Sequence, residues 1–76
     1  MNKIRKGARD GMKITFNGTP QEVADGTAVA EFLAGRGFKP AEVVAEINGE
    51  ILNAEELGRV LGEGDALNAF RVVAGG

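Results

Sequence analysis

The residues of this chain that could take part in chemistry are concentrated at its C-terminal end. Ala74, Gly75 and Gly76 follow directly on a strand-like apolar run that ends at Val73. Glycine has no Cβ, so such an end can thread a narrow channel and approach a reactive group closely. The α-carboxylate of Gly76 is ionised at neutral pH and can attack the α-phosphorus of ATP in a partner's site. The pattern favours a terminus that is itself a substrate; the alternative is a frayed end of small residues.

The composition excludes most catalytic and metal-binding sites. The chain has 76 residues, enough for one domain, and it contains no Cys, His, Trp or Tyr. Without Cys and His, ligation of zinc, haem or an iron–sulfur cluster is effectively excluded, and so are the nucleophilic triads and dyads that need His or Cys. No catalytic residue and no metal site is therefore predicted, and a disulfide-stabilised extracellular protein is not expected.

The acidic residues also do not predict a catalytic site. Glu55 and Glu56 are adjacent, and neighbouring residues on a helix do not face one another. The segment 62–64 (GEG) lacks the Lys and the Ser or Thr of a phosphate-binding loop. We interpret Glu55, Glu56, Glu63 and Asp65 as solvated surface.

Charge is unevenly distributed along the chain. Residues 1–11 contain four bases and one acid, a net charge of +3, whereas residues 12–76 contain five bases and ten acids, a net charge of −5. An acidic body does not suit nucleic acid, and no apolar run is long enough to span a membrane. We interpret residues 1–11 as a disordered basic extension or a remnant of an upstream start, with a docking arm as the alternative. The segment lacks the apolar stretch of a signal peptide, so the cytoplasm is expected.

Five short runs have the alternation or the β-branched composition of strands. Asn17-Gly18 and Asn48-Gly49 each join two of these runs, and this dipeptide is a strong hairpin signal because both positions tolerate positive φ. Pro20 has no N–H, so the second run should lie at an edge of the sheet. The predicted strands cover residues 12–16, 19–23, 43–47, 50–52 and 66–73.

One main helix is predicted over residues 28–36, with Thr27 as its N-cap. Its apolar residues recur at i, i+3 and i+4, and Gly37 lies just after its expected end. A short second helix is predicted over residues 54–61, with an apolar stripe of Leu57, Val60 and Leu61. The predicted core contains Met12, Ile14, Phe16, Val29, Phe32, Leu33, Ile47, Leu61 and Leu67.

These elements predict an α+β domain over residues 12–76, in which one amphipathic helix covers one face of a five-stranded sheet. Side chains alternate between the two faces of the last strand. If Leu67 and Ala69 meet the helix, Phe70 and Val72 point to the open face, where an aromatic beside the tail would suit partner docking. Alternation alone equally permits Phe70 in the core and Ala69 outside.

Several segments, taken in chain order, resemble the ThiS family of sulfur carriers in thiamine biosynthesis. They are residues 12–18 (MKITFNG), 26–29 (GTAV), 32–33 (FL), 44–52 (VAEINGEIL), 64–67 (GDAL) and 70–76 (FRVVAGG). The resemblance runs from Met12 to Gly76. It departs at Leu57, where many relatives carry an aromatic, and residues 1–11 have no counterpart.

The resemblance implies a ubiquitin-like β-grasp fold with a mixed sheet and a non-enzymatic role. It implies that a ThiF-like adenylating enzyme activates Gly76 with ATP, that a sulfur donor protein converts it to a thiocarboxylate, and that thiazole synthase receives the sulfur. By the same resemblance, Ala74 and Gly75 thread the partner's channel, and Phe70 and Val72 dock the partner. The carrier is expected to bind no cofactor itself and to be a monomer when free.

Three alternatives remain open at the level of sequence. The small subunit of molybdopterin synthase shares the fold and the Gly-Gly end, although it is usually longer and often has prolines before the glycines. A ubiquitin-like modifier would form isopeptides with target lysines. A plain interaction domain would carry the Gly-Gly end by accident.

Overall fold

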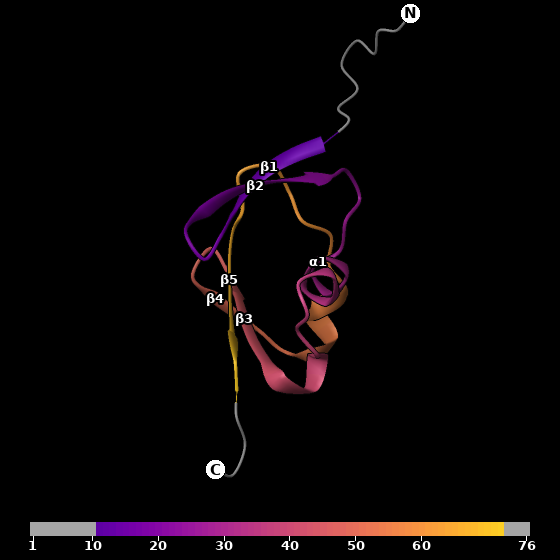
Figure 1. Cartoon of the computed structure of the whole chain (residues 1–76), viewed down its shortest axis with the longest axis vertical. Helices are drawn as coiled ribbons and strands as arrows, with labels where there is room; N and C mark the ends of the chain where they lie inside the picture. Colours follow the sequence, from indigo (N-terminus) through magenta and orange to yellow (C-terminus); the bar gives the residue numbers. More distant parts are fainter. Residues whose placement is uncertain (1–10, 73–76) are drawn as a thin grey trace, which may run out of the picture.

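The computed structural model describes residues 11–72, which form a five-stranded mixed sheet covered on one face by one α-helix (Figure 1). The sheet order is β2-β1-β5-β3-β4, with β1 and β5 parallel and the other neighbours antiparallel. The predicted α+β class and mixed sheet are confirmed. The elements are β1 (Gly11–Phe16), β2 (Thr19–Ala24), α1 (Val29–Gly35), the 3₁₀ helix η1 (Pro40–Glu42), β3 (Val43–Ile47), β4 (Glu50–Leu52), the 3₁₀ helix η2 (Ala54–Gly58) and β5 (Ala66–Arg71).

Both predicted hairpin turns are present and have the expected backbone. The φ angles are +49° at Asn17, +86° at Gly18, +52° at Asn48 and +91° at Gly49. These are the positive values that a tight turn between antiparallel strands requires. Pro20 lies in β2, which is an edge strand of the sheet as predicted. The turns therefore determine where each hairpin reverses.

The first strand begins one residue earlier than the sequence indicates. Gly11, placed in the N-terminal extension from sequence, is the first residue of β1 and lies opposite Ala24. A Cβ on Gly11 would come within 3.0 Å of the carbonyl oxygen of Val23, so a small residue suits this edge. The rest of the predicted extension lies outside the described residues.

The start of α1 differs from the prediction. The N-cap is Ala28 and not Thr27, because the Thr27 hydroxyl donates back to the carbonyl oxygen of Ala24 at 2.7 Å. The Glu31 carboxylate takes over the capping role by accepting from the backbone N–H of Ala28 at 2.9 Å. A carboxylate also interacts favourably with the positive end of the helix dipole. The start of α1 is therefore capped by the side chain of a residue in its own first turn, Glu31.

The end of α1 is a Schellman motif. Gly37 has φ +87°, its N–H donates to Ala34, and the N–H of Phe38 donates to Leu33. This pair of bonds satisfies carbonyl groups that the last turn of a helix leaves without partners. The prediction of a glycine-dependent stop is confirmed, with the helix ending at Gly35. The motif also turns Phe38 back toward the sheet, where it packs against the core.

The second helix is shorter than predicted. η2 ends at Gly58, and the backbone at Arg59 is already extended, with φ −69° and ψ 151°. Extended chain sends successive side chains to opposite sides. Val60 is therefore exposed while Leu61 is buried, so the predicted stripe was wrong for Val60. The extension is stabilised by an isolated bridge between Val60 and Ala28.

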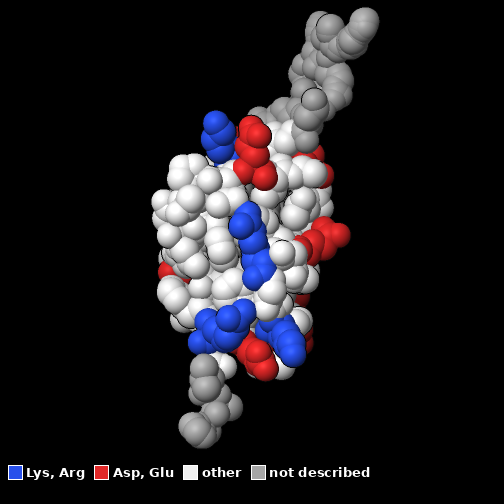
Figure 2. Space-filling model, in the orientation of Figure 1, with Lys and Arg blue, Asp and Glu red and all other residues white. Residues whose placement is uncertain are grey.

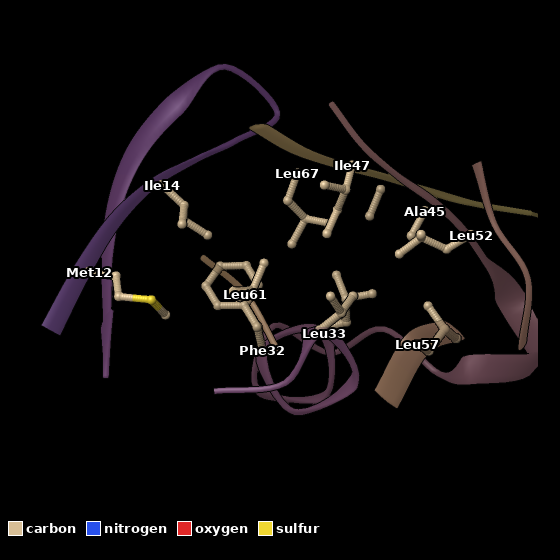
Figure 3. Close-up of a cluster of buried hydrophobic side chains, with 12 residues drawn as sticks. Met12, Ile14, Phe32, Leu33, Ala45, Ile47, Leu52, Leu57, Leu61 and Leu67 are labelled. Carbon is tan, nitrogen blue, oxygen red and sulfur yellow. The ribbon is translucent and has the colours of Figure 1, made fainter. Parts of the chain in front are cut away.

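The core lies between α1 and the sheet, where side chains from β1, α1, β3, β4, η2 and β5 converge (Figure 3). Of the predicted core residues only Phe16 is not fully buried; it is half-buried and packs against the cluster. The core also contains four residues that were absent from the predicted set, namely Ala45, Leu52, Leu57 and Ala69. Within residues 11–72, no helix is long and apolar enough to cross a membrane.

Candidate functional site

The candidate site is built on β5, the central strand of the sheet and the element that leads into the C-terminal tail. Leu67 and Ala69 are buried against the helix side, with 0% and 3% of their surfaces exposed. Phe70 and Val72 are 57% and 46% exposed on the other side. Alternation left open whether Ala69 or Phe70 faces the core. The structure places Leu67 and Ala69 on the helix side, so Phe70 is on the open face.

Phe70 belongs to an apolar patch on the open face of the sheet. Val44 lies directly opposite Phe70 in the β3–β5 register and is 39% exposed. Val72, which directly follows β5, is 46% exposed, and Ile51 on the neighbouring strand β4 is 71% exposed. We call Val44, Ile51, Phe70 and Val72 the outer patch. Exposed large apolar side chains in adjacent strands are typical of a protein–protein contact surface.

Val44 and Ile51 are surface residues that were not predicted from the sequence. In β3, Ala45 and Ile47 are the buried residues, so Val44 occupies a position that faces solvent. Ile51 has the same parity because it pairs with Glu46. The signal that could have revealed them is an apolar residue out of phase with the buried alternation of its own strand.

Asn17 fixes the position of β5 through three hydrogen bonds to that strand. Its backbone N–H donates to Leu67, and its side-chain oxygen accepts from the N–H of Ala69 at 2.9 Å. Its side-chain nitrogen donates to the carbonyl oxygen of Ala69 at 3.2 Å. The backbones of β1 and β5 pair at two positions, the second of which joins Phe16 to Leu67. The Asn17 side chain therefore continues the hydrogen bonding to β5 beyond that pair.

Asn48 makes the equivalent contacts at the start of β5. Its side-chain oxygen accepts from the N–H of Ala66 at 2.9 Å, and its backbone N–H donates to the carbonyl oxygen of Ala66 at 2.9 Å. Its side-chain nitrogen donates to Asp65 at 3.1 Å. Both hairpin asparagines thus have a second role in positioning the tail-bearing strand. The sequence could not indicate this role, because the bonds join residues far apart in the chain.

We expect the substitution Asn17→Gly to lower the free energy of unfolding by about 1–3 kcal/mol, since two hydrogen bonds worth about 0.5–1.5 kcal/mol each are lost. Glycine keeps the positive φ of the turn, so the substitution isolates the side-chain bonds. Urea denaturation measures the loss. In hydrogen exchange, the amide of Ala69 should exchange faster while the amides of β4 keep their wild-type rates. Unchanged stability together with unchanged exchange at Ala69 would contradict the role assigned to Asn17.

The acidic residues serve turns and caps. Asp65 accepts from the N–H of Gly62 at 2.8 Å, and Glu63 accepts from the N–H of Lys13 at 3.0 Å. Glu56 accepts from the N–H of Asn53 at 2.8 Å, and the Asn53 side chain accepts in return from Glu56 at 2.9 Å. Within residues 11–72, no group of three acidic residues is placed to hold a metal ion. Asp65 is half-buried, so the description as solvated surface was incomplete there.

The tail begins where β5 leaves the sheet. The last described backbone bond runs from the N–H of Val72 to the carbonyl oxygen of Glu42, at 2.7 Å. β5 ends at Arg71, earlier than the predicted Val73. The predicted site residues Ala74, Gly75 and Gly76 lie outside the described residues. Figure 1 shows β5 running to the end of the molecule opposite to the start of β1.

Comparison with known proteins identifies the family. Residues 14–76 match the sequence profile of the ThiS family. A crystal structure of the thiamine biosynthesis protein ThiS from Geobacter metallireducens is similar, with 32% identity and a TM-score of 0.71, covering 86% of this chain and 100% of that chain. A search of curated protein sequences finds no match. The chain therefore belongs to the ThiS family, the small sulfur carriers of thiamine biosynthesis, which are acted on by enzymes and are not enzymes themselves.

Proposed function

We propose that the carboxylate of Gly76 is the group that carries sulfur. A ThiF-like adenylating enzyme joins the carboxylate to the α-phosphorus of ATP, and pyrophosphate leaves. A sulfur donor protein releases sulfide, HS⁻, which attacks the carbonyl carbon of the acyl adenylate; the carbon–sulfur bond forms as AMP leaves and a proton is lost, so the product is a thiocarboxylate. Thiazole synthase then takes the sulfur for the thiazole of thiamine. The carrier itself positions its terminus, and the partner supplies the phosphate-binding groups and the metal.

The position of β5 is the observation that supports this proposal. The strand is central in the sheet, buried through Leu67 and Ala69, and bonded to Asn17 on one side and to β3 on the other. It therefore gives the tail a rigid base at Val72. Four residues follow Val72, and four residues of extended chain span at most about 13–14 Å. That length allows the terminus to enter a partner's site while the outer patch rests on the partner's surface.

The proposed cycle has consequences for the cofactor, the location and the partners of the carrier. ATP is consumed by the adenylating enzyme, so the carrier needs no cofactor of its own. We propose that the cycle runs in the cytoplasm and that the free carrier is a monomer. The outer patch is the surface proposed to dock the adenylating enzyme and thiazole synthase in turn, since one tail can occupy only one site at a time.

Intact-mass spectrometry tests the proposal directly. The chain is incubated with ATP, the adenylating enzyme and a sulfur source, and its mass should rise by one oxygen-to-sulfur exchange. A protein modifier would instead appear as much larger conjugates with target proteins. To separate the thiamine role from the molybdopterin role, the loaded chain is presented to thiazole synthase and to the large subunit of molybdopterin synthase. Sulfur transfer to the molybdopterin enzyme alone would contradict the proposed pathway.

We expect Phe70→Ala to weaken binding to the adenylating enzyme by about 1–3 kcal/mol, as for an interface aromatic of middling importance. The free energy of unfolding should change little, because the Phe70 side chain is 57% exposed. Titration calorimetry measures the affinity and urea denaturation the stability. Val60→Ala is the matched control, since Val60 is 55% exposed but lies outside the outer patch. Equal effects of the two substitutions on binding would contradict docking through the outer patch.

A further inference from the structure

The end of the molecule where the tail begins is basic, although the domain is acidic. Three of the five bases of residues 12–76 are exposed at the C-terminal end of α1, in the loop after it and at the end of β5, namely Arg36, Lys39 and Arg71. We call these three residues the basic rim. Figure 2 shows basic side chains gathered around this end of the molecule. The rim and its acidic neighbour Glu42 sum to +2, whereas the other two bases and nine acids of residues 12–76 sum to −7.

Arg71 is tied to the loop that follows α1. Its guanidinium lies 4.8 Å from the centre of the Phe38 ring and donates to the carbonyl oxygen of Gly37 at 3.0 Å. A guanidinium over an aromatic face is attracted by the ring quadrupole. The contact joins the last residue of β5 to the Schellman turn, and Lys39 follows Phe38 directly. Arg71 and Lys39 are thus brought to the same end of the fold.

Arg36 joins the same cluster through the aromatic rings. Its guanidinium lies 4.9 Å from the centre of Phe32 and 5.9 Å from that of Phe16, and it also donates to the side chain of Gln21. The Phe16 ring contacts Phe38 edge-to-face at 6.1 Å between centroids. Two arginines on different elements are therefore linked through packed rings, which restrains both charges near the surface. Guanidinium groups held this way lose less side-chain entropy when they meet a carboxylate.

The basic rim lies at the base of the tail. Arg71 immediately precedes Val72, whose N–H bonds to Glu42 in η1, and Lys39 is the N-cap of η1. Any partner that accepts the tail must approach this end of the domain. Charges beside an insertion point act on encounter and orientation, because complementary surface potential raises the association rate.

We propose that the basic rim docks on an acidic protein surface at the entrance of the adenylating enzyme's tail channel. The inference rests on the proposed function and adds to it a second, electrostatic contact on the helix side of β5, distinct from the apolar outer patch. An acidic entrance attracts the basic rim and repels the acidic remainder of the carrier. Attraction at one end and repulsion elsewhere orient the carrier with its tail toward the channel.

Steady-state kinetics of thiocarboxylate formation test the inference. At about 0.05 M salt, Lys39→Glu should raise the KM for the carrier about 3–10-fold with little change in kcat, as expected for a surface charge that acts on association. At about 0.5 M salt the difference should largely disappear, because the Debye length is then only a few ångströms. Arg59→Glu is the matched control, because it makes the same change of charge at a residue after η2 that lies beside the N-terminus of α1, and it should have a smaller effect.

Arg71 separates charge from packing. Arg71→Gln should raise the KM for the carrier in the same salt-dependent way, and Arg71→Lys, which keeps the charge but loses the planar ring contact, should restore it. Melting temperatures of all variants are measured alongside. If Arg71→Lys fails like Arg71→Gln at both salt concentrations, the residue acts through packing and the inference is wrong.

Two further results would overturn the inference, and they are distinguishable from failure of the proposed function. If Arg59→Glu raises the KM as much as Lys39→Glu does, only net charge matters. If the substitutions raise the KM for ATP and leave that for the carrier unchanged, the rim meets nucleotide phosphates and not an acidic protein surface. Failure of the wild-type chain to form any thiocarboxylate would instead overturn the proposed function itself.

Discussion

Deletion of Gly76 is expected to abolish or severely reduce sulfur loading while leaving the free energy of unfolding unchanged. The deletion moves the carboxylate back by one residue, up to about 3.3–3.6 Å of extended chain. Reacting atoms must come within about 3–3.5 Å in an aligned geometry, so a displacement of this size removes productive attack on ATP. The buried cluster described for the fold consists of residues between Met12 and Ala69, so the deletion removes none of its members.

Addition of one residue after Gly76 should be equally damaging, because the carboxylate then belongs to a different residue. Gly75→Val should also reduce loading, since a β-branched side chain obstructs a narrow channel, while Gly75→Ala is a smaller obstruction and serves as the graded control. Intact mass reports thiocarboxylate formation, and urea denaturation reports stability. A plain interaction domain predicts none of these losses. Normal loading of an unprocessed, extended chain would show that the terminus is not the carrier group.

The substitution Phe32→Ala is expected to lower the free energy of unfolding by about 3–5 kcal/mol. Phe32 is only 8% exposed, and its ring contacts Phe16 at 5.0 Å between centroids and lies under the guanidinium of Arg36. Truncation therefore leaves a cavity and also removes an aromatic contact and a cation–π contact. Small domains have about 5–15 kcal/mol of total stability, so the loss is a large share.

Urea denaturation followed by circular dichroism measures this loss. Phe70→Ala is the matched control, because it makes the same chemical change on the same fold at a side chain that is 57% exposed. The two substitutions should differ by more than about 2 kcal/mol, since the exposed ring leaves no comparable cavity behind. Similar losses for both would contradict the difference in burial between the Phe32 and Phe70 side chains.

Local sequence was sufficient wherever a feature depends on neighbouring residues. The Asn17-Gly18 and Asn48-Gly49 turns followed from the backbone preferences of those two residue types. The stop of α1 followed from Gly37, because a glycine is favoured where φ must be positive. Family membership likewise followed from short segments in a fixed order, ending in Gly75-Gly76, and the match over residues 14–76 confirms it.

Two predictions about helix ends were wrong, one because of a competing local bond and one because of a contact between distant segments. Thr27 has a good capping side chain, but its hydroxyl bonds to Ala24 and Glu31 supplies the cap of α1. Residues 57–61 have helical spacing, yet the chain is extended from Arg59, where the bridge from Val60 to Ala28 stabilises it. The first error comes from a bond to a residue three positions back, and the second comes from the packing of the N-terminus of α1 beside the segment after η2.

By itself, the sequence determined the class of this protein, its five strands and main helix, most of its core and the candidate terminus. Those properties depend on residue identity and short-range periodicity, which the chain carries directly. Only the tertiary structure decided which face of β5 presents Phe70, because alternation is symmetric until α1 covers one side of the sheet. Only folding brings Asn17 to Ala69 and Arg71 to Phe38, since the first pair is 52 residues apart and each contact requires the mixed sheet to close around its central strand.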